Sequence, residues 1–304
     1  MPAIADLESM RQELEASGEY RVLRRLREVD EFDPPNATRK SVALFLDTET
    51  TGFDVDRDRI IELAVVAFEH DQAGNVYRVL RAGSQLEDPG RPLPPQVTAI
   101  TGLTDADVAG QRISEEEVEA LIGDARLVIA HNAAFDRPFV ERRLPRFAEL
   151  DWACSISDVG WRELGFGSSS MEFLAYKHGF FFEGHRALID CRAGLEVLAS
   201  RANGSGRTAM ALLQENARRN SVRLWAEGSP FDRKDLLKER RYRWNPEARA
   251  WWTEVPEEEH EAELEWLAAN VYGRRRPLPY FVVTARERYS RRVPEAYPAD
   301  APRR

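Results

Sequence analysis

A continuous apolar run that ends in two acidic residues constrains this 304-residue chain more than any other feature. Residues 41–46 read Ser-Val-Ala-Leu-Phe-Leu, and Asp47-Thr48-Glu49 follows directly. An unbroken apolar run of this length is typical of a strand that is buried on both faces, at the centre of a sheet covered by helices. Alternate residues of a strand share a face, so Asp47 and Glu49 should project together from its end.

The pattern after this strand predicts a mixed sheet flanked by helices. We expect further strands over 60–68, 76–82 and 127–130, and helices over 114–122, 135–143 and 186–202. The Gly-containing turn at 71–75 indicates that the strands on either side of it form an antiparallel pair. Strands first, followed by alternating strands and helices, favour an α/β fold.

The chain divides by composition into five predicted segments. These are a helical N-terminal extension (1–40), an α/β domain (41–202), a linker with a connector helix (203–220), a small α+β domain rich in Trp and Arg (221–292) and a tail (293–304). In the extension, apolar residues recur at helical spacing, first at Leu7, Met10 and Leu14 and then at Val22, Leu23 and Leu26. Such a helix either packs on the main domain or forms an arm that binds a partner.

Composition bounds the class of protein. Hydrophobic content of 43% and charged content of 31% are ordinary for a soluble globular protein. No run of 18 apolar residues and no signal-like start is present, so we expect no membrane partner and a cytoplasmic location. Cys154 and Cys191 are too few for a disulfide framework or a cysteine zinc site, which fits a reducing compartment. The net charge of −9 argues against a sequence-independent DNA coat protein.

Two further acids complete a candidate metal site. Asp136 begins the helix after the strand at 127–130, and Asp190 lies in the segment His-Arg-Ala-Leu-Ile-Asp. Carboxylates that are brought together repel one another, and burying them is costly unless cations pair with them. Oxygen ligands suit Mg²⁺ or Mn²⁺, and two such ions could hold a scissile phosphate and activate a water. The sequence therefore indicates a two-metal site for cutting phosphodiester bonds.

His185 is the candidate general base. It stands five residues before Asp190 and follows Gly184, which gives the loop conformational freedom. Imidazole has an intrinsic pKa suited to proton transfer near neutral pH.

Three motifs resemble those of a known family. Asp-Thr-Glu-Thr-Thr-Gly (47–52), His-Asn-Ala-Ala-Phe-Asp (131–136) and His-Arg-Ala-Leu-Ile-Asp (185–190) are similar to the exonuclease motifs of the DEDDh branch of the DnaQ-like 3′–5′ exonucleases. This is the family of the bacterial DNA polymerase III epsilon proofreading subunit. The resemblance covers 41–202 and implies an RNase H-like fold, two Mg²⁺ or Mn²⁺ ions and release of nucleoside 5′-monophosphates from a 3′ end. It also implies that four acids are metal ligands and that His185 is the base; the acids are Asp47, Glu49, Asp136 and Asp190.

Six further residues are candidates for substrate binding. In the resembling family, residues at the positions that follow the first acid approach the terminal nucleotide, which implicates Thr48, Thr50, Thr51 and Gly52. His131 and Asn132 either border the nucleotide pocket or only brace the end of their strand.

The expected function is 3′–5′ exonuclease action on single-stranded or frayed DNA ends in proofreading or repair, with a polymerase or repair complex as partner. An exoribonuclease of the same superfamily is an alternative, because RNA is told from DNA by contacts to the 2′-hydroxyl that these motifs do not reveal. A non-catalytic scaffold that acts through 1–37 and 220–304 is another, although the intact set of five residues speaks against it.

The C-terminal region allows two interpretations. Five of the seven tryptophans lie there, interleaved with basic residues, most densely between Pro230 and Trp252. Basic and aromatic side chains together can follow a phosphate backbone and stack on bases. A small domain also needs aromatic residues to fill its core, so a structural or protein-contact role remains open.

Overall fold

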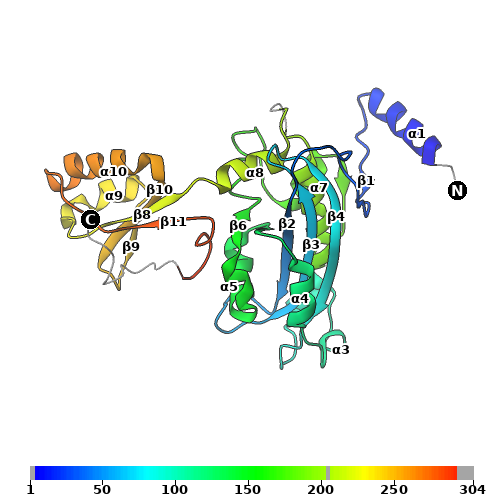
Figure 1. Cartoon of the computed structure of the whole chain (residues 1–304), viewed down its shortest axis with the longest axis horizontal. Coiled ribbons are helices and arrows are strands. Elements are labelled where there is room, and N and C mark those ends of the chain that lie inside the picture. Colours follow the sequence, from blue (N-terminus) through cyan, green and yellow to red (C-terminus); the bar gives the residue numbers. More distant parts are fainter. Residues whose placement is uncertain (1–3, 203–205, 293–304) are drawn as a thin grey trace.

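The computed structural model describes residues 4–202 and 206–292, so the predicted tail and residues 203–205 of the linker lie outside the described residues. Figure 1 shows a central α/β body, a smaller C-terminal unit beside it, and the N-terminal helix α1 standing apart from both. Within the described parts of the chain, no helix is both long enough and apolar enough to cross a membrane.

The body is built on one five-stranded sheet. Its strands are β2 (Ser41–Thr50), β3 (Ile60–His70), β4 (Val76–Leu86), β5 (Leu127–Ala130) and β6 (Asp151–Cys154). The strand order is β4-β3-β2-β5-β6, in which β3 runs antiparallel to both of its neighbours while β2, β5 and β6 are parallel. The predicted α/β class with a mixed sheet is confirmed, including the antiparallel pair around the turn at 71–75.

Helices cover both faces of this sheet (Figure 1). They are α2 (Pro95–Thr101), α3 (Asp105–Val108), α4 (Glu115–Ile122), α5 (Ala133–Arg143), α6 (Met171–Lys177), α7 (Ala187–Ala199) and α8 (Ala209–Ala217), with a 3₁₀ turn at Pro145–Glu149. Side chains of β2 alternate between two cores: Phe45 packs with residues of α6, α7 and α8, whereas Leu44 and Leu46 pack with residues of α4 and α5. The apolar run is therefore buried on both sides, as its sequence predicted.

A glycine allows α7 to approach the central strand closely. A Cβ atom at Gly194 would lie 2.1 Å from Cζ of Phe45, a separation that no side chain tolerates. Because α7 rests directly on the sheet at this point, its first turn brings Asp190 close to Asp47 and Glu49 at the end of β2.

The N-terminal extension is only partly helical. Helix α1 covers Ile4–Ala16, but β1 (Arg24–Arg25) is a strand that pairs in parallel with β7 (Phe180–Phe181). The expectation that the helical pattern continues through Val22, Leu23 and Leu26 is therefore wrong. The reason is tertiary pairing, since the Leu26 amide donates a hydrogen bond to the carbonyl of Phe181 and its side chain packs on the main core.

The C-terminal unit is a small α+β structure, as expected. Its antiparallel sheet has the order β11-β8-β10-β9, with strands β8 (Ser221–Ala226), β9 (Arg243–Asn245), β10 (Ala250–Pro256) and β11 (Tyr280–Val283). Its helices are α9 (Lys234–Glu239) and α10 (His260–Leu267), with 3₁₀ turns at Phe231–Arg233 and Glu257–Glu259 and a π turn at Ala268–Tyr272. Leu224, Leu237 and Leu267 join sheet and helices in one core.

The segment after β11 returns to the body. The amide of Trp152 on β6 donates a hydrogen bond to the carbonyl of Ala285, at 2.8 Å. The fully buried guanidinium of Arg137 donates to the carbonyls of Arg286 and Arg288. Residues 284–292 thus contact the α/β domain, although we predicted them as part of the small domain; the domain boundaries themselves stay a prediction.

Candidate active site

The end of β2 presents the first two acids. Asp47 and Glu49 alternate along the strand, and they lie on one side of it as the pattern predicted. The pairing of β2 with β3 shifts in register between Glu49 and Thr50, so the regular strand ends just beyond the two carboxylates. Both side chains are partly accessible, which leaves room for a ligand.

Asp190 joins them from the first turn of α7. Carboxylate oxygens of Asp47, Glu49 and Asp190 all lie within 4.8 Å of one another. The amide of Arg186, just before the helix, donates a hydrogen bond to Oδ2 of Asp190 at 3.1 Å and fixes its orientation. Asp190, which lies more than a hundred residues after the other two predicted ligands in sequence, therefore converges with them in space.

Asp136 lies beside this trio but is not part of it. It lies in the first turn of α5, is 2% exposed, and accepts hydrogen bonds at Oδ1 from the amide and the hydroxyl of Thr48, at 3.1 and 2.8 Å. Its charge is the largest electrostatic influence on Asp47 after burial itself. Asp136, the fourth predicted ligand, therefore lies next to Asp47. The role of Thr48 in the fold is to hold Asp136 in place.

Glu62 is a fifth carboxylate that sequence reasoning missed. It lies opposite Glu49 on β3 and is 1% exposed. Arg186 forms an ion pair with it, at 3.2 Å between Nε and Oε2. Within the apolar stretch 60–68, Glu62 is the only charged residue, and this was the signal that could have found it. Its ion pair ties the start of α7 to the sheet and so helps to place Asp190.

Burial and mutual repulsion raise the pKa values of the clustered carboxyls. Burial first, and then the charges of Asp190 and Glu62, raise the pKa of Glu49 to about 8. Burial raises the pKa of Asp190 to about 6, and burial together with the charge of Asp136 raises that of Asp47 well above its usual range. Side by side, these carboxyls resist ionisation, and a bound divalent cation stabilises their ionised forms. Because all of their ligand atoms are oxygens, these residues fit the hard ions Mg²⁺ or Mn²⁺.

The raised pKa values predict an unusual pH dependence of stability without metal. A carboxyl whose folded pKa exceeds its unfolded value binds more protons in the folded state, so the free energy of unfolding falls as pH rises between the two values. For Glu49 this window runs from about 4.5 to about 8. Each unit of raised pKa is worth about 1.4 kcal/mol, so we expect the melting temperature in chelator to fall by several degrees from pH 5 to pH 8.

Saturating Mg²⁺ should remove most of this fall, because the ion binds the ionised carboxylates of the folded state. Thermal denaturation followed by circular dichroism, with and without chelator, checks both statements. Glu49→Gln is the matched control, and its melting temperature should depend less on pH. A melting temperature in chelator that is flat or rises over this range would contradict the prediction.

His185 lies at the rim of the carboxylate cluster. Its side chain is exposed, and it is close enough to Asp190 for its charge to lower the pKa of that carboxyl. Its backbone has φ = 67°, in the left-handed region that few residues other than Gly and Asn adopt. A non-glycine residue held in this conformation next to a charged cluster favours a functional role for the imidazole.

The remaining predicted residues brace the site. Thr51 is 4% exposed, and its hydroxyl donates to Asp58 at 2.9 Å while it accepts from Arg91. Thr50 donates to the carbonyl of Gly52, and a Cβ atom at Gly52 would lie 2.5 Å from the Asp58 carboxylate. The side chains of Thr50 and Thr51 therefore shape the turn after β2, and the absence of a side chain at Gly52 leaves room for the Asp58 carboxylate.

His131 and Asn132 end β5 in different ways. A ring nitrogen of His131 lies 2.7 Å from the Ser155 hydroxyl, and burial lowers the pKa of this histidine to about 4. Asn132 is exposed, with φ = 83°, and begins α5 without a side-chain cap. His131 therefore braces the end of β5. Asn132 instead faces solvent at the start of α5, the helix that carries Asp136.

Phe53 is a second residue that sequence reasoning missed. It is 89% exposed, and its ring lies 6.0 Å from the ring of Phe135, which is the neighbour of Asp136. An aromatic ring that is held in water beside a cluster of acids offers a stacking surface for a flat group. The sequence signal was its position, directly after the acidic motif and Gly52.

Comparison with known proteins relates the α/β body of the chain to one protein family. The exonuclease family RNase T matches residues 44–198. The PolC-type DNA polymerase III of Thermotoga petrophila is 31% identical over 158 residues, which are 50% of this chain and 11% of that protein. The DNA polymerase III subunit epsilon of Aquifex aeolicus is 29% identical over 160 residues, which are 50% of this chain and 76% of the relative.

Among solved structures, exonuclease X in complex with 5′ overhanging duplex DNA is 29% identical, with a TM-score of 0.42. The match covers 57% of this chain and 99% of that one. The present chain therefore spans about a tenth of its PolC-type relative and most of its epsilon-type relative.

Proposed function

This chain belongs to the RNase T family of exonucleases, and from that premise we propose that it releases nucleoside 5′-monophosphates from the 3′ end of DNA. One observation carries the proposal: the carboxylates of Asp47, Glu49 and Asp190 lie within 4.8 Å of one another beside an exposed histidine. A partly buried carboxylate trio of this kind has little use in a structural module, because it costs stability.

The proposed metal ligands are Asp47, Glu49, Asp136 and Asp190. The charges of Asp136 and Asp190 both act on Asp47, so Asp47 would contribute its carboxylate at the centre of the ligand set. When bound, two Mg²⁺ or Mn²⁺ ions supply positive charge that neutralises the phosphate and lowers the pKa of a water. Thr48 keeps Asp136 in place, and Arg186 orients Asp190 through its amide.

His185 then accepts the proton of the attacking water at a ring nitrogen. The water oxygen forms a new bond to phosphorus, the bond between phosphorus and the 3′-oxygen of the preceding nucleotide breaks, and that oxygen takes a proton from solvent. Because His185 is exposed at the rim, it can return its proton to bulk water after each cycle. Phe53 offers the terminal base a ring on which to stack.

The choice of DNA and of a replication or repair setting rests on the relatives. The proteins from Thermotoga petrophila and Aquifex aeolicus are both DNA polymerase III components by name. Their similarity to this chain supports a DNA 3′ end as substrate, and a polymerase or repair complex as partner.

An assay with matched oligonucleotides tests the proposal. Single-stranded DNA and RNA of one sequence, labelled at the 5′ end, should be shortened stepwise from the 3′ end in Mg²⁺ or Mn²⁺, and not in chelator. Mass spectrometry should find nucleoside 5′-monophosphates. A circular single strand serves as control and should remain intact, because it has no end.

The DNA strand should be degraded faster than the RNA strand. The reverse preference would assign the chain as an exoribonuclease. Absence of metal-dependent shortening on every linear substrate would reject the catalytic proposal in favour of a scaffold.

A further inference from the structure

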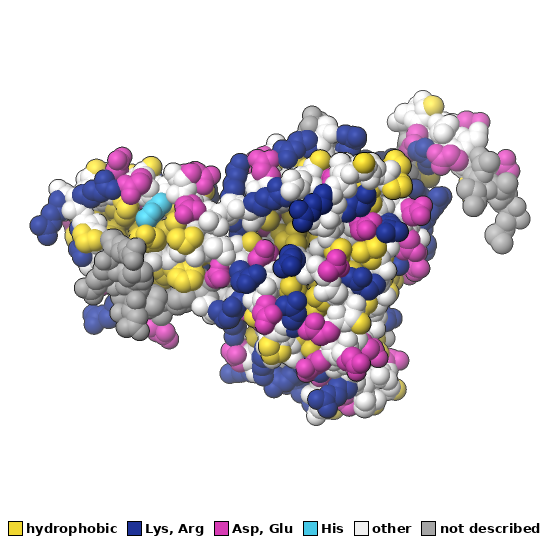
Figure 2. All heavy atoms as spheres, viewed as in Figure 1, with side chains coloured by type: hydrophobic (Ala, Val, Ile, Leu, Met, Phe, Trp, Pro, Cys, Tyr) yellow, Lys and Arg dark blue, Asp and Glu magenta, His cyan; other side chains and the backbone are white. Residues whose placement is uncertain are grey.

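The net charge of −9 gives the chain no overall attraction for nucleic acid. Figure 2 shows basic and acidic side chains interspersed over the visible face, with no broad region of one sign there. A contact to nucleic acid outside the active site is therefore expected from a local arrangement of side chains. The C-terminal unit, which the proposed catalysis does not use, contains such an arrangement.

Two aromatic residues of this unit are exposed. Phe231 is 80% exposed and Trp244 is 49% exposed, and among residues 206–292 they are the only large hydrophobic side chains exposed to this degree. Single exposed apolar residues are common and need no explanation. These two, however, are linked by a series of contacts.

The contacts join the 3₁₀ turn before α9, helix α9 itself and strands β9 and β10. Nζ of Lys234 lies 4.1 Å from the ring centre of Phe231, and Nζ of Lys238 lies 6.0 Å from that of Trp251. The ring of Trp251 in turn lies 5.5 Å from that of Trp244. The two lysines are one helical turn apart on α9 and so share a face. Phe231, Lys234, Lys238, Trp251 and Trp244 together form what we call the aromatic–lysine strip.

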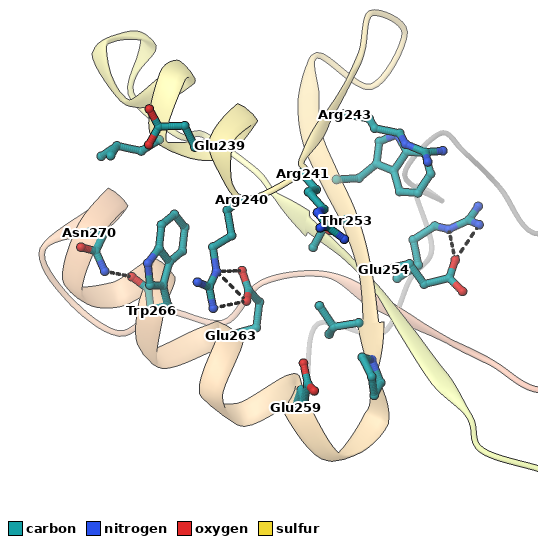
Figure 3. A pocket seen from close by; sticks show the side chains of 15 residues that line it. Glu239, Arg240, Arg241, Arg243, Thr253, Glu254, Glu259, Glu263, Trp266 and Asn270 are labelled. Carbon is teal, nitrogen blue, oxygen red and sulfur yellow. Dashed lines mark hydrogen bonds and ion pairs between the residues drawn. The ribbon is translucent and has the colours of Figure 1, made fainter. Parts of the chain in front are cut away.

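Arg240, another cation of the unit, is engaged in its fold. It lines a hollow of about 940 Å³, and Figure 3 shows it between Trp266 and Glu263. The Arg240 guanidinium pairs with the buried carboxylate of Glu263 at 2.8 Å and stacks on the Trp266 ring at 4.4 Å. Its role is to join α9 to α10, and none of the active-site acids lines this hollow.

The lysines of the strip are less constrained. Among the described residues, no ion pair joins Lys234 to an acid. Lys238 faces Asp235 at 3.7 Å, but both side chains are more than half exposed, so water screens this pair. Both ammonium groups are therefore available to a phosphate.

We propose that the aromatic–lysine strip binds single-stranded nucleic acid, with bases stacked on Phe231 and Trp244 and phosphates contacted by Lys234 and Lys238. Aromatic rings with interleaved cations suit this ligand because every base has a flat face and every linkage has a negative charge. The biological use of the strip rests on the proposed function, since it would retain a strand whose 3′ end is being shortened. Its binding does not depend on catalysis.

Equilibrium binding without metal tests the strip alone. The full chain is titrated into fluorescein-labelled oligothymidylate of about 30 nucleotides in chelator, and anisotropy is read. The double variant Phe231→Ala/Trp244→Ala should raise Kd about tenfold or more, the range that stacking contacts give. Tyr20→Ala removes an aromatic side chain that is 62% exposed elsewhere and is the matched control; it should bind like the wild type.

A second pair of variants tests the lysines without touching an aromatic ring. Lys234→Gln/Lys238→Gln should reduce the slope of log Kd against log salt by about 1.4, or about 0.7 for each lost phosphate contact. Because Lys238 is exposed, Lys234 is only partly buried and Leu237 is the buried residue of this short helix, circular dichroism of these variants should match the wild type. Cleavage of a trinucleotide, which is too short to span both sites, should also be unchanged.

The outcomes separate this proposal from the catalytic one. If no substrate is degraded but the strip variants weaken binding, the strip stands and the catalytic proposal falls. If degradation is normal and both strip variants bind within twofold of the wild type, the strip is a surface for a protein and the present inference is overturned. A matched oligouridylate shows whether RNA uses the strip too; weakening with either oligonucleotide supports it.

Discussion

Replacing Asp47 with Asn is expected to lower the rate of nucleotide release by about three orders of magnitude or more, because its carboxylate lies among the other acids of the proposed metal site. The same change should stabilise the protein in chelator. It removes one partly buried negative charge from a set of five acids that repel one another, so the melting temperature should rise by a few degrees.

These opposite effects distinguish a catalytic role from a structural one. Steady-state release of labelled nucleotide and thermal denaturation in chelator are the two measurements. Asp124→Asn is the matched control, because that carboxylate is 79% exposed and lies outside the cluster. Asp47→Asn protein that keeps more than about a tenth of wild-type activity would remove Asp47 from the proposed ligand set.

Removing the His185 imidazole is expected to cost about 10²- to 10⁴-fold in rate, the range for loss of a general base. Stabilisation by Mg²⁺ should persist, since His185 is outside the proposed ligand set. The loss should shrink as pH rises, because hydroxide from solution then replaces the missing base.

The left-handed backbone at His185 dictates which variants to use. His185→Gly and His185→Asn both accept φ = 67° readily, so neither should disturb the loop. Equal losses in both would assign the effect to the imidazole. If His185→Gly were inactive and His185→Asn retained full activity, the backbone or a hydrogen bond would matter rather than proton transfer, and the base assignment would be wrong.

The regular strands and helices could be predicted from the local pattern of residues in the sequence. The run at 41–46 predicted a buried strand, and the predicted helix over 114–122 forms at 115–122, where the Ser114 hydroxyl accepts a hydrogen bond from the Glu117 amide. Prediction failed where a partner distant in sequence decides the conformation. Leu26 has helical spacing with its neighbours, yet it follows a strand because β7 supplies hydrogen-bond partners.

The residues of the candidate site divide in the same way, into those that local sequence identified and those that only tertiary contacts made clear. Asp47, Glu49, Asp136, His185 and Asp190 were identifiable because their types and motifs are local properties of the chain. Glu62 and Phe53 were missed, because a lone charge in a strand and a phenylalanine after the acidic motif are weak signals until the structure shows what they face. The bracing role of Thr51 likewise depends on Asp58 and Arg91, which the turn brings to it.

The sequence by itself determined which chemical groups this protein has and on which kinds of element they lie, because strand alternation and helix spacing are set by near neighbours. Only the tertiary structure decided which groups meet. Gly194 lets α7 lie against Phe45 and so brings Asp190 to within 4.8 Å of Asp47. In the C-terminal unit, folding brings together Phe231, Lys234 and Trp244 in the aromatic–lysine strip. Such distances depend on packing between segments far apart in the chain, which no local pattern encodes.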